Sequence, residues 1–163
     1  MLRTKYKVIN FFPNIAMSKQ QELTLPPIKM RTKQVAGIRY VWDALRGKYL
    51  VLTPEERVRR YMLAFLVSYC RIPAHSLVQE YPVALNGMAQ RADIVAVGTD
   101  GKPLLIVECK APDVEIDETV CVQAARYNAV VGARYMILTN GCKHYCYERT
   151  AEGYRQLDAF PRF

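Results

Sequence analysis

Apolar and polar positions alternate with different periods along the chain, and each change of period marks a predicted element. Residues 1–30 are polar or interrupted by proline, so we expect a flexible arm there, with Met17 as an alternative native start. Residues 31–163 then carry the patterned segments of a single domain. Within them, residues 33–52 contain two short β-prone runs, AGIRYVWD and KYLVL, which predict an irregular lead-in hairpin.

A helix is predicted to follow this hairpin. Thr53 is a suitable N-cap, Pro54 occupies the first helical position, and Glu56 stands three residues after the cap, which is the pattern of a capping box. The apolar residues of RVRRYMLAFLVSY recur with a helical period. Pro73 is expected to lie beyond the end of this helix.

Strands and a second helix complete the predicted fold. SLVQEYPVAL is predicted to form one strand, and RADIVAVGTDGKPLLIVECKAP two more, joined by a turn at Asp100-Gly101. VCVQAARYNAVV is a predicted helix that ends at Gly132. ARYMILT and KHYCYERT are strands joined at Asn140-Gly141, and the tail GYRQLDAFPRF adds either an edge strand or a short helix. We therefore expect an α/β fold with a central mixed β-sheet flanked by helices.

The predicted strand pair in residues 91–112 carries charged residues at the ends of its apolar runs. If Asp100-Gly101 forms a two-residue turn, Asp93 lies directly opposite Glu108. Their β-carbons would then be roughly 4.5 to 5.5 Å apart. Lys110 follows Glu108 by two positions and so lies on the same face of the sheet. Three charges are therefore expected to converge on one spot.

Two facing carboxylates need a compensating cation, because like charges across a strand pair destabilise a sheet. A divalent metal held by Asp93 and Glu108 would meet this need and could polarise a scissile phosphate, with Lys110 orienting water or stabilising charge. A structural alternative is that Lys110 simply bridges both carboxylates at the rim of the sheet. The same register places Arg91 opposite Lys110, which we expect to disfavour the protonated lysine.

The spacing of these residues resembles the D…E-x-K core of the PD-(D/E)XK nuclease superfamily. TPEERVRR, RADIVAV, LLIVECKAP and QAARYNAVVGARYMILTNG are more closely similar to the N-terminal nuclease domain of type I restriction enzyme R subunits, over residues 41–147. The resemblance implies a restriction-endonuclease-like core and a DNA endonuclease that depends on Mg²⁺, with Mn²⁺ as a substitute ion. It makes Asp93, Glu108 and the backbone carbonyl of Cys109 metal ligands, and Lys110 the catalytic lysine.

The resemblance also assigns roles on the two predicted helices. Gln123 and Tyr127 match a Q-x-x-x-Y motif that contributes to the active site or to DNA contact in a subset of these nucleases. Their spacing places them on one helical face, although a core tyrosine beside a solvated glutamine would give the same pattern. The family has a further acidic residue on the first helix. Helical geometry favours Glu55, near the apolar face, over Glu56, which is expected in the capping box, and Glu80 is a third candidate.

Composition and charge favour a nucleic-acid partner. The 163 residues include 23 Lys and Arg against 15 Asp and Glu, which gives a net charge of +8. A strongly basic protein favours polyanionic partners, and phosphate contacts need no base-reading motif. RNA stays open as a substrate, because chemistry at phosphate does not reveal the sugar. The residues expected to contact DNA phosphates are Arg57, Arg59, Arg60, Arg126 and Arg134.

Other features narrow the class of protein. Five scattered cysteines without a C-x-x-C pair are typical of a cytoplasmic chain with reduced thiols, and no apolar run is long enough to span a bilayer. Cys142, His144 and Cys146 alternate along a predicted strand, which spaces them too widely to bind one zinc ion unaided. No G-x-x-x-x-G-K-[ST] motif occurs, so we expect no ATP site, and either a standalone relative or a domain separated from its motor.

Two functional hypotheses follow from these patterns. One is a metal-dependent endodeoxyribonuclease of a restriction system, with DNA as its substrate and specificity, methylation or translocase subunits as its partners. The other is a catalytically silent nuclease-fold module that binds DNA or regulates another protein without turnover. The charged residues of the strand pair are where the two hypotheses differ.

Overall fold

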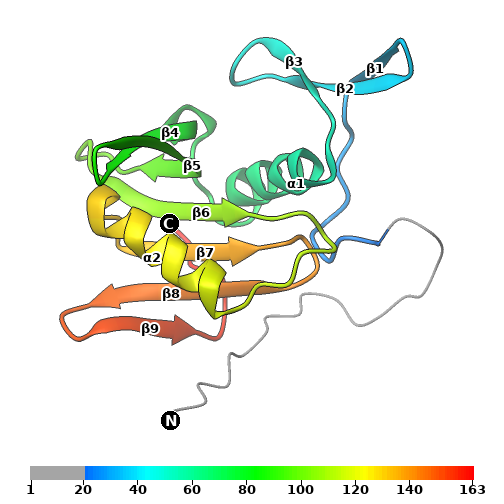
Figure 1. The fold of residues 1–163 in the computed structure, drawn as a ribbon. Coiled ribbons are helices and arrows are strands. Elements are labelled where there is room, and N and C mark those ends of the chain that lie inside the picture. The colour runs from blue at the N-terminus through cyan, green and yellow to red at the C-terminus, as the bar shows by residue number, and fades with distance from the viewer. Residues whose placement is uncertain (1–20) are drawn as a thin grey trace.

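The computed structural model describes residues 21–163 and contains two β-sheets and two α-helices (Figure 1). The alternative start at Met17 and most of the expected flexible arm lie outside the described residues. The described part of that arm, residues 21–30, does not behave as expected, because it packs on the domain and buries Leu25 in the core. The folded part of the chain therefore begins earlier than the sequence pattern suggested.

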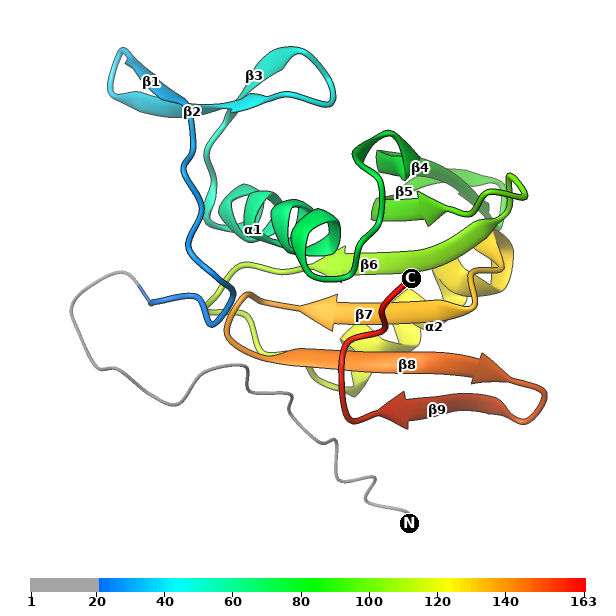
Figure 2. The same cartoon turned by 180° about the vertical axis from the view of Figure 1, so that it is seen from behind.

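The predicted lead-in hairpin is a small antiparallel sheet in the order β1-β2-β3. The additional strand arises at Ala36-Gly37, where positive φ angles of 49° and 80° allow a two-residue hairpin turn. Figures 1 and 2 show α1 lying between this small sheet and strand β6 of the large one. The strands are β1 (Thr32–Val35), β2 (Ile38–Asp43) and β3 (Lys48–Val51).

Helix α1 (Pro54–Ser68) begins where the capping pattern predicted. The Thr53 hydroxyl accepts a hydrogen bond from the Glu56 amide (3.0 Å), and Pro54 occupies the first turn. Val58, Met62 and Phe65 recur at helical spacing and are buried against the large sheet. The helix thus covers one face of that sheet with an apolar stripe.

The large sheet has six strands in the order β4-β5-β6-β7-β8-β9. Only β6 and β7 run parallel, because helix α2 (Glu118–Val131) connects them by a crossover, and every other pair is antiparallel. Helix α2 ends at Gly132, in the left-handed conformation (φ 78°), as predicted. The strands are β4 (Leu77–Leu85, preceded by the 3₁₀ turn Ala74–Ser76), β5 (Met88–Val97), β6 (Pro103–Cys109), β7 (Tyr135–Thr139), β8 (His144–Thr150) and β9 (Gly153–Leu157).

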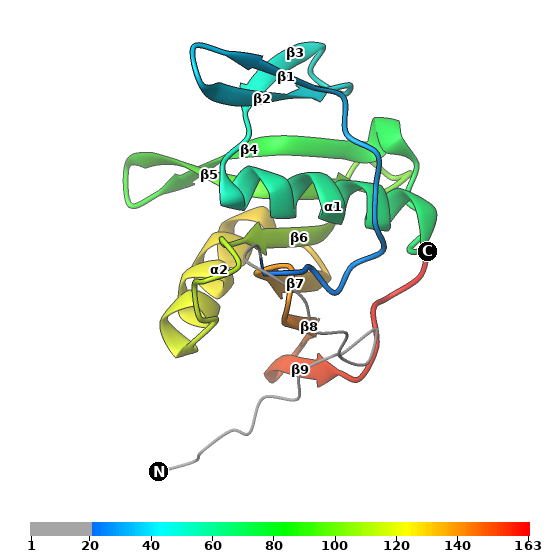
Figure 3. The same ribbon diagram turned by 90° about the vertical axis from the view of Figure 1, so that its right-hand side faces the viewer.

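The two helices cover opposite faces of the large sheet (Figure 3). Alternate residues of β6 show this division, since Leu105 and Val107 join the apolar cluster under α1, whereas Ile106 joins the cluster under α2. The mixed sheet between two helices confirms the expected α/β fold. In the part of the chain that the structure describes, neither helix has the length and apolar character needed to cross a bilayer.

The C-terminal tail resolves the alternative left open by the sequence. Its first half is the edge strand β9, and the remainder turns back across the α1 side of the sheet (Figure 2). Phe160 packs edge-on against Phe65 of α1 with ring centroids 4.7 Å apart, and the Phe163 amide donates to the Cys70 carbonyl (3.0 Å). The tail therefore closes the core beneath α1.

Candidate active site

The β5–β6 pair has the predicted register but not the predicted turn. Ile94 pairs with Val107 and Ala96 with Leu105, which is the alignment that sets Asp93 against Glu108. The connection is not a two-residue turn at Asp100-Gly101. Instead, the Gly98 amide donates to the Lys102 carbonyl (2.8 Å) across a longer loop, and a bulge at Leu104, between Pro103 and Leu105, restores the register.

Regular pairing of β5 and β6 stops at Ile94, so the side chain of Asp93 takes over the next backbone contact. Its Oδ2 accepts a hydrogen bond from the Cys109 amide (2.7 Å) at the end of β6. The following amide, that of Lys110, donates to the Thr139 carbonyl at the end of β7 (2.8 Å). The candidate site therefore lies where the parallel strands β6 and β7 both end (Figure 1).

Glu108 and Lys110 form the second part of the site. The Lys110 ammonium lies 3.0 Å from Glu108 Oε1, and the Glu108 side chain is almost fully buried. Burial, followed by the negative charge of Asp93, raises the pKa of Glu108 to about 7. Ionisation of Glu108 is thus less favourable than that of an ordinary glutamate.

The expectation that Arg91 disfavours the protonated form of Lys110 is wrong. Arg91 is largely exposed and lies 3.5 Å from Glu80. Burial of Lys110 acts to lower its pKa, but the charges of Glu108 and Asp93 outweigh burial, and the pKa of Lys110 is raised. Lys110 therefore carries its positive charge at neutral pH.

Arg59 of α1 is the member of the site that sequence reasoning misplaced. We expected it to face DNA, but it is buried, and its Nη2 lies 2.7 Å from Asp93 Oδ1. The same guanidinium contacts Glu55 (3.5 Å) and Glu56 (2.8 Å), one turn earlier on the helix. The i, i+3 and i, i+4 spacing of these residues was the signal that could have indicated an ion-paired arginine.

The three acidic candidates beyond the strand pair lie in different surroundings. Glu55 is half-exposed and joins the site through Arg59, and its charge contributes to raising the pKa values of Glu108 and Lys110. Glu56 is buried and lies 2.7 Å from Arg60. Its side chain does not accept from the Thr53 amide as a capping box would require, because that amide donates to the Val51 carbonyl. Glu80 is paired with Arg46 (2.8 Å). Glu55 is the one that borders the strand-pair charges.

The Q-x-x-x-Y residues contact each other on α2. Gln123 Nε2 donates to the Tyr127 hydroxyl (3.3 Å), which in turn donates to Gln90 Oε1 on β5 (3.3 Å). Gln123 is exposed, whereas Tyr127 is buried in the cluster under α2. Within the described residues, these hydrogen bonds reach the strand of Asp93 but not its carboxylate. The structure thus places Tyr127 as a core residue with a polar end.

The family model described as "Type I restriction enzyme R protein N terminus (HSDR_N)" matches residues 54–161. The chain belongs to this family. Since the match begins at the first residue of α1, the small sheet precedes it. A search of curated proteins found no match.

A solved structure with a similar fold supports the architecture of this HSDR_N chain. It is a fragment described as an HsdR subunit of a type I restriction enzyme from Vibrio vulnificus YJ016. The sequences are 21% identical, with a TM-score of 0.52 over 68% of this chain and 24% of that chain. The likeness concerns the fold, and the chain spans about a quarter of the length of the structure it matches.

The donors of this HSDR_N site suit a hard divalent cation. Asp93 and Glu108 offer carboxylate oxygens, and Cys109 offers a backbone carbonyl beside them, which are ligand types that Mg²⁺ prefers. A cation would also offset the unfavourable ionisation of Glu108. In the described part of the chain, no group of three or more His, Cys, Asp or Glu side chains is arranged to hold a metal, including around Cys142, His144 and Cys146. Water and substrate oxygens would have to complete the coordination.

The basic surface expected for DNA contact is smaller than predicted. Arg60, like Arg59, is buried, and it lies 3.1 Å from Asp43. Arg134 is exposed but paired with Glu148 (2.7 Å). Neither Arg57 nor Arg126 has a carboxylate partner among the described residues. Of the five arginines expected to bind phosphate, these two are the ones available for it.

Proposed function

We propose that the chain is a metal-dependent endodeoxyribonuclease domain that hydrolyses phosphodiester bonds in DNA. The observation that carries this proposal is the convergence of Asp93, from the middle of β5, with Glu108 and Lys110 at the end of β6. Membership of the type I restriction enzyme R protein N-terminal family supports it. DNA, and the specificity, methylation and translocase subunits of a restriction system, would be its partners in the cytoplasm.

Each group of the site would have a separate role in hydrolysis. Asp93, Glu108 and the Cys109 carbonyl would hold Mg²⁺ or Mn²⁺, and the ion would polarise the phosphate and lower the pKa of a water molecule. Lys110, which stays protonated, would stabilise negative charge on the phosphoryl oxygens. Glu55 borders the open side of the site, where its half-exposed carboxylate can orient water. Asp93 is held in place by Arg59 on one oxygen and the Cys109 amide on the other.

A second function is favoured by a specific feature of the site. Each carboxylate already has a cationic partner within the protein, Arg59 for Asp93 and Lys110 for Glu108. Such internal neutralisation suits a catalytically silent module that binds DNA or regulates a partner without turnover. The two functions differ in whether the protein binds a divalent metal and cleaves DNA.

Nicking of supercoiled plasmid DNA tests the proposal. The wild-type protein should nick DNA with Mg²⁺ or Mn²⁺ and not with EDTA, and Glu108→Gln and Lys110→Met should each lower the rate by about 100-fold or more. Asp100→Asn is the matched control, because Asp100 lies in the loop of the same strand pair, away from the site. Circular dichroism verifies that the variants fold. Cleavage that survives in both variants would overturn the assignment.

Calorimetric titration with Mn²⁺ separates the two functions. An active site should bind Mn²⁺ in the wild type and in Asp100→Asn, with binding lost in Glu108→Gln. DNA binding that weakens with salt, without metal binding and without cleavage, would support the silent module instead.

A further inference from the structure

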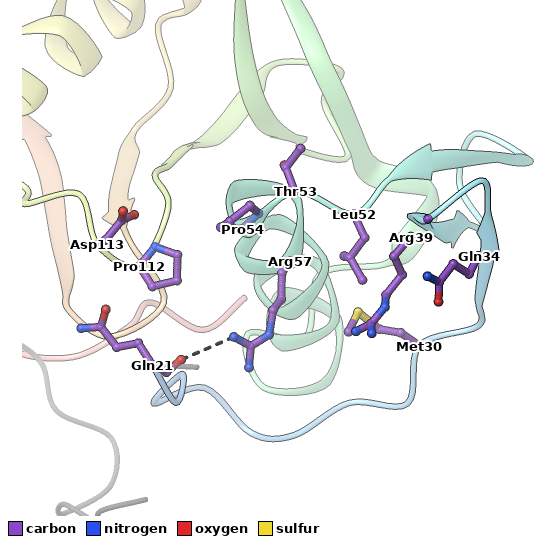
Figure 4. Close-up of a pocket in the computed structure, with 11 residues that line it drawn as sticks. Gln21, Met30, Gln34, Arg39, Leu52, Thr53, Pro54, Arg57, Pro112 and Asp113 are labelled. Carbon is purple, nitrogen blue, oxygen red and sulfur yellow. Dashed lines mark hydrogen bonds between the residues drawn. The ribbon is translucent and has the colours of Figure 1, made fainter. Parts of the chain in front are cut away.

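A cleft of about 650 Å³ lies between the small sheet and the beginning of α1 (Figure 4). It does not coincide with the candidate active site, but it adjoins it. Pro54, at one wall, directly precedes Glu55, and Pro112, at another, follows Lys110 by two positions. A long ligand lying in the cleft would therefore continue toward the site at the ends of β6 and β7.

Two arginines line this cleft from different elements. Figure 4 shows Arg39 of β2 and Arg57 of α1 with Gln34 beside Arg39, and Asp113 on the opposite side next to Pro112. Arg57 Nη1 reaches the Gln21 carbonyl at 3.4 Å. The charged residues that line the cleft are thus two arginines and one carboxylate, with a net positive charge.

Neither arginine has a carboxylate partner within residues 21–163. Arg59 and Arg60 on the same helix differ in this respect, because each forms ion pairs with carboxylates inside the protein. A guanidinium group can donate two hydrogen bonds at once to phosphate, and it keeps its charge at any physiological pH. Arg39 and Arg57 are therefore suited to binding a polyanion.

The wall that carries Arg39 is anchored to the main domain. Asp43, at the end of the same strand, is fully buried and lies 3.1 Å from Arg60 of α1. It also accepts hydrogen bonds from Gln79 of β4, at 3.0 and 3.1 Å. Val41, between the two ends of the strand, is buried as well. These contacts fix the small sheet relative to α1, so the two arginines are held as a pair.

We propose that this cleft binds the sugar-phosphate backbone of double-stranded DNA beside the scissile phosphate, with Arg39 and Arg57 contacting phosphates. The choice of DNA as the polyanion rests on the proposed function. The inference gives a role to the small sheet, which precedes the residues that match the family. Arg39 and Arg57 then take the role of contacting DNA that the sequence had suggested for Arg59 and Arg60.

Fluorescence anisotropy with a labelled duplex of about 20 base pairs, at a series of salt concentrations and without divalent metal, tests the cleft. Arg39→Gln and Arg57→Gln should each weaken binding and lower the slope of log K against log salt by about 0.9, and the double variant by about twice that. Lys33→Gln is the matched control, because Lys33 projects from the opposite face of the same small sheet, over the Tyr49 ring (4.0 Å). It should leave both quantities unchanged.

The outcomes distinguish this inference from the proposed nuclease activity. Wild-type affinity and salt slope in the double variant would overturn the cleft as the DNA site, as would a loss in Lys33→Gln equal to that in Arg39→Gln. Either result would leave plasmid nicking and its loss in Glu108→Gln untouched. Conversely, absence of nicking combined with weakened binding in Arg39→Gln and Arg57→Gln would support the cleft and reject the nuclease. Tighter binding of single strands or duplex RNA than of duplex DNA would also overturn the inference.

Discussion

Arg59 and Asp93 form an ion pair of 2.7 Å that joins α1 to β5 within the candidate site. Both side chains are largely withdrawn from solvent, and Arg59 also contacts Glu56, another buried carboxylate. An arginine in this position places positive charge beside two carboxylates, and it links the helix to the strand pair. The small sheet joins the same network through Arg60 and Asp43.

Removing Arg59 should destabilise the fold. Arg59→Ala leaves the buried Glu56 and the partly buried Asp93 without this partner, and loss of one member of a buried pair costs about 3 to 5 kcal/mol. Urea denaturation followed by circular dichroism measures the change. Arg39→Ala, which removes an arginine without a carboxylate partner, should change the free energy of unfolding by about 0.5 kcal/mol or less. Equal stability of the two variants would show that the ion pair contributes little.

Asp43 should stabilise the protein in a manner that depends on pH. Although burial acts to raise its pKa, the hydrogen bonds from Arg46 and the charge of Arg60 prevail and lower it to about 2. A depressed carboxyl pKa gives stability that is present above the unfolded value of 3.8 and is lost as pH falls through about 2. The stability advantage of wild type over Asp43→Asn should therefore shrink by about 2 kcal/mol between pH 4 and pH 2. Asp113→Asn, an exposed control, should show no such trend.

The sequence was sufficient for the periodic elements and for the register that sets Asp93 against Glu108. Both follow from local patterns, since a helix cap, an apolar stripe and the alternation of a strand each depend on residues close together in the sequence. The connection at residues 98–102 differed, because a bulge and a longer loop can give the same register as a tight turn.

Long-range charge pairing was not accessible in the same way. Arg59 and Arg60 resemble any basic helix face in sequence, and their burial depends on Asp93 and Asp43, which come from distant strands. Arg39 stood out in no sequence pattern, and its place in a cleft depends on how the small sheet packs on α1. Which arginines are free for DNA is therefore a property of the tertiary structure.

Metal binding at the candidate site should depend on pH near neutrality. Burial and the charge of Asp93 raise the pKa of Glu108 to about 7, and a metal must displace the proton from that carboxyl group. Mn²⁺ affinity, measured by calorimetric titration, should therefore rise from pH 6 to pH 7, by up to about tenfold per pH unit, and level off above pH 8. Glu108→Asp should retain a pH dependence, whereas Glu108→Gln should bind weakly at every pH. Affinity independent of pH in the wild type would contradict Glu108 as a ligand.

His144 provides a stability switch at the end of β7, where it contacts Thr139, whose backbone carbonyl accepts from the Lys110 amide. Its ring is fully buried, with Nδ1 2.7 Å from the Thr139 hydroxyl and Nε2 2.8 Å from the Thr24 hydroxyl. The Thr24 hydroxyl can donate to the carbonyls of Gly141 and Cys142, both at 3.2 Å, so it accepts from Nε2. With the proton of the neutral ring on Nε2, Nδ1 accepts from the Thr139 hydroxyl, which itself accepts from the Gly141 amide (2.9 Å). This arrangement satisfies the neutral ring.

Protonation of His144 should therefore destabilise the folded protein. Burial lowers its pKa from 6.5 to about 4, so in this range the unfolded chain binds a proton that the folded protein excludes. Stability should fall by about 3 kcal/mol as the pH drops from 6.5 to 4, over and above the change in His144→Gln. Denaturant midpoints across this range isolate the effect, because subtracting the variant removes the opposing contribution of Glu108. His75→Gln removes the other, exposed histidine and should show the same dependence of stability on pH as the wild type. If stability changed with pH equally in His144→Gln and in the wild type, a neutral buried ring would be refuted.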